Sequence, residues 1–288
     1  MRIHSSMLAV PAILLSLGIL NGCGRKAERT NEVVAASAAR LPLDPLDPAW
    51  AEAPGHVEKL ILQDLVEPRL MKASTPEILV EALTSGSEIA FRLSWPDEAV
   101  NDLPGAGRFL DQCAVQIPRA IEADAPAPQL GEAGRPVEIS FWRADWQASV
   151  DGRKDNINAL FPNAAIDHYP FEAKPLDPGS SDQKEMATRY APSQAVGNRR
   201  VGPRETPVED LLAEGPGTLS PAPARISRGM GVRTKEGWAV VIIRKLPEGL
   251  TPRRRSAVAF AVWQGSEQEA GARKMRSGWV PLALRAAK

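Results

Sequence analysis

Cysteine and histidine are scarce in this chain of 288 residues, which holds two cysteines and three histidines. Neither Cys23 nor Cys113 belongs to a CxxC or CxxCH motif, and no HxxxH spacing occurs. Zinc centres and covalently attached c-type haem are therefore disfavoured. A hydrolytic enzyme is the weakest of the functional hypotheses, because no nucleophile elbow or metal motif frames a Ser, His and Asp set.

An excess of charge of either sign is also missing. Lysine and arginine together number 35, and so do aspartate and glutamate, so composition predicts no nucleic-acid partner. A long apolar run is missing as well, because the stretch from Met7 to Leu20 is short and is broken by Pro11. It reads as an export signal rather than a membrane span.

The signal ends in Leu20-Asn21-Gly22-Cys23, which is similar to a bacterial lipobox. Residues 1–22 are then a lipoprotein signal peptide, and Cys23 carries a lipid through its sulfur. Because Gly24 rather than Asp follows, we expect a lipid-anchored periplasmic protein held at the outer membrane. The alternative is an ordinary cleaved signal with a coincidental cysteine. Cys113 would remain as the one thiol, most simply a small buried residue.

After the signal, residues 23–40 are polar and alanine-rich and are interpreted as a flexible tether, so residues 41–288 form the folded domain. Short apolar or alternating runs separated by Pro, Gly and Asp then predict an all-β fold, a β-sandwich with long irregular insertions and one or two short helices. The predicted strands are Val57–Gln63, Ile78–Leu83, Glu88–Trp95, Gln112–Ile117, Val137–Arg143, Gly237–Lys245, Ala257–Trp263 and Gly278–Leu284. Within Glu88–Trp95, alternation places Ile89, Phe91 and Leu93 on one face and Glu88 and Arg92 on the other.

A helix is predicted after Thr206, with Thr206 as N-cap, Pro207 at the first helical position, Glu209 three residues after the cap and Gly215 as the stop. The preceding segment, Phe171 to Glu205, is rich in Pro, Ser and charge and has no sustained period. A loop of that length is usually functional or disordered, and we expect it to help dock a partner.

Lys274 is the most informative single residue, because it lies in an otherwise apolar and aromatic hairpin. Between Trp263 and Trp279, an ammonium must reach water, find a carboxylate or lose its proton. Arg273 and Arg276 would favour loss of the proton, since like charge lowers a lysine pKa. The plainer interpretation is a solvated basic turn.

Taken in order, several segments resemble the haem-b-binding γ subunits of complex molybdoenzymes, the group of ethylbenzene dehydrogenase, dimethyl sulfide dehydrogenase, selenate reductase and chlorate reductase. The resemblance covers most of residues 41–288. Its segments are Leu43–Trp50, Val80–Leu83, Ile89–Trp95, Asp111–Pro118, Gly131–Trp142, Asp167–Pro170, Gly215–Leu219, Gly237–Val241 and Phe260–Trp279.

This resemblance implies a β-sandwich that holds one b-type haem through an axial lysine and an axial methionine. The family's closing Gly-Arg-Lys motif is matched with Lys274, the haem-iron ligand. The methionine position falls on Leu130, which has no sulfur, and Gln129 beside it offers only a carbonyl oxygen. The other methionines, at 71, 186, 230 and 275, lie elsewhere in the sequence.

Two functional hypotheses follow. In the first, the chain is a non-catalytic electron-transfer subunit with one b haem, relaying electrons between molybdenum and iron–sulfur subunits and a soluble cytochrome. In the second, it is a haem-free β-sandwich lipoprotein that serves as a scaffold or membrane anchor for a partner complex. Lys274 favours the first hypothesis and Leu130 the second.

Overall fold

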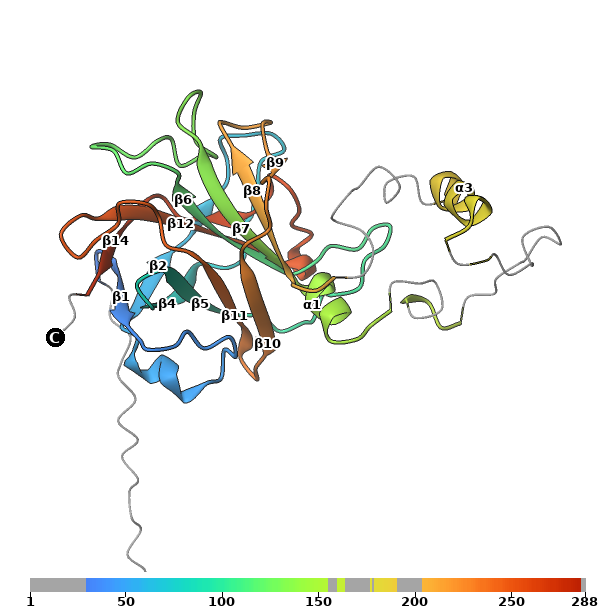
Figure 1. The fold of residues 1–288 in the computed structure, drawn as a ribbon, viewed down its shortest axis with the longest axis horizontal. Coiled ribbons are helices and arrows are strands. Elements are labelled where there is room, and N and C mark those ends of the chain that lie inside the picture. Colours follow the sequence, from blue (N-terminus) through green and yellow to red (C-terminus); the bar gives the residue numbers. More distant parts are fainter. Residues whose placement is uncertain (1–29, 155–159, 164–176, 178, 191–203, 286–288) are drawn as a thin grey trace, which may run out of the picture.

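In the computed structural model, the described residues are 30–154, 160–163, 177, 179–190 and 204–285, and they form a two-layered β-structure (Figure 1). This confirms the predicted all-β, sandwich-like fold. The strands are β1 Val33–Ser37, β2 Gly55–Lys59, β3 Ile61–Leu62, β4 Glu77–Thr84, β5 Glu88–Pro96, β6 Gln112–Pro118, β7 Val137–Arg143, β8 Val208–Ala213, β9 Ser220–Pro221, β10 Arg228–Arg233, β11 Gly237–Lys245, β12 Ser256–Trp263, β13 Met275–Arg276 and β14 Val280–Leu284. The helices are α1 Ala144–Val150 and α3 Ser181–Tyr190, with 3-10 turns at Pro48–Glu52 (η1) and Gly265–Glu267 (η2).

Strand β12 connects the two layers. Its first residues pair with β14, which continues through β1, β4, β5, β11 and β10. From Ala259 onward β12 pairs with β6 instead, which continues through β7, β8 and β9, and its last residues also pair with β13. One strand therefore belongs to both layers, so the layers are held at a fixed separation along one edge.

The main hydrophobic core fills the space between the layers. As the alternation in β5 predicted, Ile89, Phe91 and Leu93 all enter this core, and the Phe91 ring meets the Phe260 ring of β12 edge to face at 6.3 Å. On the other face of β5, Arg92 pairs with Glu81 of β4. The period of two along β5 thus separates a fully apolar face from a face with paired charges.

The helix predicted after Thr206 is wrong, because residues 208–213 form strand β8. Pairing with β7 runs from Val208 opposite Trp142 to Ala213 opposite Val137, and five of the six β8 residues are buried. The hydroxyl of Thr206 still accepts a hydrogen bond, from the amide of Val208 two residues on, which makes a turn rather than a helix cap. The local capping signal was overridden by a long-range partner strand.

Other boundaries also differ from prediction. The folded part begins before residue 41, since β1 pairs in parallel with β4 and β14, so the last residues of the predicted tether belong to the sheet. The predicted strand Val57–Gln63 is interrupted at Leu60 and forms two strands. The first, β2, pairs with β4, and the second, β3, pairs with β13. Helix α3 lies within the segment expected to lack regular structure, most of which is outside the described residues.

Residues 1–29, which include the predicted signal and Cys23, are outside the described residues as well. Within the part of the chain that the structure describes, no helix has the length and apolar character to cross a membrane.

Candidate functional site

The second layer consists of β6, β7, β8, β9 and the part of β12 from Ala259 onward. Its outer face, which points away from the main core, carries the candidate site. Along β6 and β12, alternate residues point away from the main core, and Ala114 of β6 lies directly opposite Ala261 of β12. Their neighbours Cys113 and Val262, also opposite each other, enter the core on the inner face. Because alanine methyl groups are short, the outer face is left recessed where valine or phenylalanine would have filled it.

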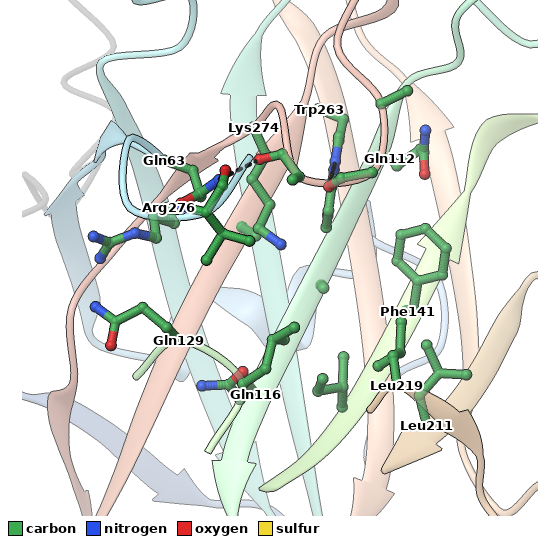
Figure 2. A pocket seen from close by; sticks show the side chains of 18 of the residues that line it. Gln63, Gln112, Gln116, Gln129, Phe141, Leu211, Leu219, Trp263, Lys274 and Arg276 are labelled. Atoms are coloured by element: carbon green, nitrogen blue, oxygen red, sulfur yellow. Dashed lines mark hydrogen bonds between the residues drawn. The ribbon is translucent and has the colours of Figure 1, made fainter. Parts of the chain in front are cut away.

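A cavity of about 580 Å³ lies over this recess (Figure 2). Strand residues Ala114, Ala259, Ala261, Ile139 and Phe141 contribute to its lining, and loop residues from 63–67, 108–110, 128–130, 216–219 and 270–277 complete it. The volume falls within the range of roughly 300–1,000 Å³ that is typical of small-molecule and cofactor sites. The cavity is therefore large enough for a sizeable apolar ligand.

Lys274 extends its side chain into the cavity, as Figure 2 shows. Its Nζ lies 5.0 Å from the centroid of the Trp263 ring, so Trp263 is beside Lys274 as the sequence analysis expected. Burial lowers the pKa of Lys274 from 10.5 to about 8, and the positive charge of Arg276 contributes in the same direction. The interpretation of Lys274 as a solvated basic turn does not hold, because the amine is largely buried and faces the cavity, where about half of it is neutral at pH 8.

The backbone around Lys274 is fixed by Gln63, a buried residue that the sequence analysis did not single out. The Gln63 amide donates to the Lys274 carbonyl oxygen at 3.1 Å, and Gln63 Nε2 donates to the Ala272 carbonyl oxygen at 3.0 Å. Two bonds from one residue hold both ends of the Ala272 to Lys274 segment. The Lys274 amine is thus presented from a rigid turn.

Leu130 lines the same cavity, so the structure brings together the two positions that the family resemblance pairs. The loop at 126–131 is tied down by Trp279 Nε1, which donates to the Pro126 carbonyl oxygen, and by Gln116 Nε2, which donates to the Pro128 carbonyl oxygen at 3.0 Å. Leu130 itself has φ = 68°, a conformation that is uncommon for residues other than glycine. Trp279 therefore supports the loop that carries Leu130.

Arg276 and two glutamines lie at one end of the cavity, and the other end is mainly apolar apart from Gln112. In Figure 2, Arg276, Gln129 and Gln116 lie toward one end, and Phe141, Leu211 and Leu219 lie toward the other, with the Lys274 amine between them. The sequence analysis noted Arg276 only as an influence on Lys274 and missed Gln116. The signal that could have found Gln116 is a pair of glutamines, at 112 and 116, on the same face of an otherwise apolar strand.

The alternative sulfur donors are not at the site. Among the described residues that line the cavity there is no methionine. Met275 points into the main core, and Met71 is 82% exposed. Cys113 is fully buried in the main core, as predicted, and burial raises the pKa of its thiol.

Comparison with known proteins identifies related chains. The chain is 26% identical over 204 residues to the chlorate reductase subunit γ of Ideonella dechloratans, covering 68% of this chain and 60% of that protein. It is 24% identical over 262 residues to a proposed respiratory nitrate reductase haem subunit (ORF7) of Haloferax mediterranei, covering 88% of this chain and 73% of that protein. A solved family 9 carbohydrate-binding module of Caldicellulosiruptor kristjanssonii, in complex with cellotriose, has a TM-score of 0.43 at 8% identity, covering 89% of this chain and 94% of that one.

The alignment to the chlorate reductase subunit thus spans less than two thirds of that protein's length. The family model described as ethylbenzene dehydrogenase, in contrast, matches residues 47–275, which is most of this chain and includes both Leu130 and Lys274. The chain therefore belongs to the ethylbenzene dehydrogenase family, the γ-subunit family of molybdoenzymes that the sequence resemblance indicated.

Proposed function

We propose that this chain is an electron-transfer subunit that binds one b-type haem in the cavity of the second layer. The observation that carries the proposal is that Lys274 and Leu130, far apart in sequence, line one cavity of about 580 Å³. The donor chemistry fits, because lowering the pKa of Lys274 from 10.5 to about 8 makes it easier to remove the proton and free the nitrogen lone pair for iron. Bound haem would supply reversible one-electron chemistry.

The residues of the chain have separate tasks in this function. Lys274 supplies a nitrogen ligand from a turn that Gln63 fixes. The methyl groups of Ala114 and Ala261 and the ring of Phe141 form an apolar surface that excludes water from the ligand. Exclusion of water and control of ligand orientation are the means by which a protein tunes a redox centre.

Leu130 favours a second candidate function. Leucine can pack against a flat ligand but has no electron pair for iron, so the family's methionine contact is not available from this position. The alternative is a haem-free scaffold lipoprotein with the same fold. In either case the proposed partners are the molybdenum and iron–sulfur subunits of a periplasmic oxidoreductase, and a soluble cytochrome is the further partner of the electron-transfer form.

A haem reconstitution experiment separates the two functions. The purified protein and its Lys274→Ala, Leu130→Met and Lys245→Ala variants are supplied with haem, and absorption spectra are recorded after gel filtration. We expect retention by the parent protein and by Lys245→Ala, an exposed control, and loss of retention by Lys274→Ala. Leu130→Met should convert the spectrum to a six-coordinate low-spin form, because a thioether donor is added.

If neither the parent protein nor Leu130→Met retains haem, the electron-transfer function is wrong and the scaffold function replaces it. Equal retention by the Lys274→Ala variant would contradict the role of Lys274 as the iron ligand.

The proposed location is the periplasm, with a lipid on Cys23 as the anchor, and the proposal rests on the lipobox-like sequence Leu20-Asn21-Gly22-Cys23. Mass spectrometry of the mature protein should find an acylated N-terminal Cys23. An unmodified N-terminus downstream of Cys23 would refute the lipid anchor.

A further inference from the structure

Arg276 is a buried cation with no acidic partner. Arg276 lies on β13, opposite Ala261 of β12 and Ile61 of β3, and is only 8% exposed. Its Nη1 donates to the Ser277 carbonyl oxygen at 3.3 Å, and its buried Nε has no hydrogen-bond partner. Burial lowers the pKa of Arg276, and Asp64 offsets this effect only in part without forming an ion pair.

Other buried arginines in the described chain are neutralised differently. Arg244 pairs with Glu138 and Arg204 with Glu209, and the partly buried Arg92 pairs with Glu81. None of the ion pairs among the described residues involves Arg276. A buried guanidinium without an anion is costly, and the cost is removed when a carboxylate or phosphate takes its donors.

The cavity supplies no such anion from the protein itself. Of the described residues that line it, Glu67 is the sole acid, and its largely exposed side chain pairs with Arg69 at 2.8 Å. The basic residues of the lining are Arg108, which is exposed, Arg143, which pairs with Asp145, and Lys274 and Arg276, for which no ion pair is formed among the described residues. An apolar cavity with uncompensated cations matches a ligand that has an apolar body and carries its own negative charge.

We propose that Arg276 forms a carboxylate-binding subsite that sets the orientation of the ligand in the cavity. This inference rests on the haem function proposed above, in which the carboxylate of the ligand is a propionate of the tetrapyrrole. Arg276, with the Gln129 amide at the same end of the cavity, would hold the propionate, and Phe141 and Leu211 at the other end would contact the apolar part of the ligand (Figure 2). Lys274 lies between these two ends (Figure 2).

The test compares haem with haem dimethyl ester, which has the same ring and iron but no carboxylate charge. Dissociation constants for both are measured by absorption titration, in one detergent buffer, for the parent protein and for Arg276→Gln, Arg276→Lys and Arg253→Gln. We expect the parent protein to bind haem roughly tenfold more tightly than the ester, the scale of one charge-assisted hydrogen bond. Arg276→Gln should bind the two equally, whereas Arg253→Gln, an exposed control, should keep the preference.

Arg276→Lys keeps the charge and guards against a folding defect in the glutamine variant, and it should keep part of the preference. If the parent protein binds both compounds equally, the subsite is overturned but the haem function is not. If Arg276→Gln keeps the full preference for haem, the subsite is likewise overturned. Binding of neither compound by the parent protein would overturn the haem function, and the subsite with it.

Discussion

The two faces of the second layer are built by the same strands and differ in what fills them. On the inner face, Cys113, Val115 and Ile117 of β6 meet Phe260 and Val262 of β12 in the closed main core. On the outer face, Gln112, Ala114 and Gln116 of β6 and Ala259 and Ala261 of β12 line the cavity. The backbone alternation is identical on both faces. The inner face packs against the other layer, whereas the short side chains of Ala114, Ala259 and Ala261 leave the outer face recessed.

Charge follows the same division. The inner-face residues of β6 and β12 named above carry no charge, whereas the outer face has Lys274 and Arg276 at the cavity. An inner face of this kind stabilises the fold, and an outer face with small residues and unpaired cations suits a ligand. Each face can therefore be perturbed separately: changes on the inner face should alter stability, and changes on the outer face should alter ligand binding.

The largest effect is expected from a change on the inner face. Ile117→Ala removes a fully buried side chain from the core and leaves a cavity, so it should lower the free energy of unfolding by about 2–5 kcal/mol. Chemical denaturation followed by tryptophan fluorescence measures this change. A loss below about 1 kcal/mol would show that the inner face is not closely packed.

A smaller effect, on binding rather than stability, is expected from the outer face. Ala114→Leu places a larger side chain in the cavity floor, opposite Ala261, and should weaken haem binding by roughly tenfold to a hundredfold, the scale of overpacking. Haem titration and denaturation are compared in this variant and in Ile117→Ala. Unimpaired haem binding by Ala114→Leu would mean that the ligand does not lie on this floor.

The smallest effect concerns the pH dependence of stability. Because the pKa of Lys274 falls from 10.5 to about 8 on folding, the unfolded chain holds more protons at this site between those values. Stability of the haem-free protein should therefore rise with pH through this window, by at most about 1.4 kcal/mol per pH unit from this group.

Lys274→Met removes the titrating group, so the difference in unfolding free energy between the parent protein and this variant should change between pH 8 and 10.5. Denaturation curves at several pH values test this. A difference that is constant with pH would contradict the burial of the amine.

Prediction from sequence succeeded where a strand's own alternation fixed its environment. Ile89, Phe91 and Leu93 entered the core as expected, and Trp263 lies beside Lys274 as expected. It failed at residues 206–215, where local capping residues favoured a helix and the partner strand β7 imposed a strand. It also placed the start of the fold too late, because β1 is stabilised by β4 and β14, which lie far away in sequence.

By itself, the sequence determined the all-β class, because the period of a strand depends only on local order, and its resemblance to the family marked Lys274 and Leu130 as candidate ligand positions. Only the tertiary structure decided that Lys274 and Leu130 share a cavity and that Arg276 is buried there without an acid. Those properties depend on strand order and register, which join β13, β12 and β6 and bring the 126–131 loop over them. Long-range pairing of this kind leaves no mark on the spacing of residues along one chain.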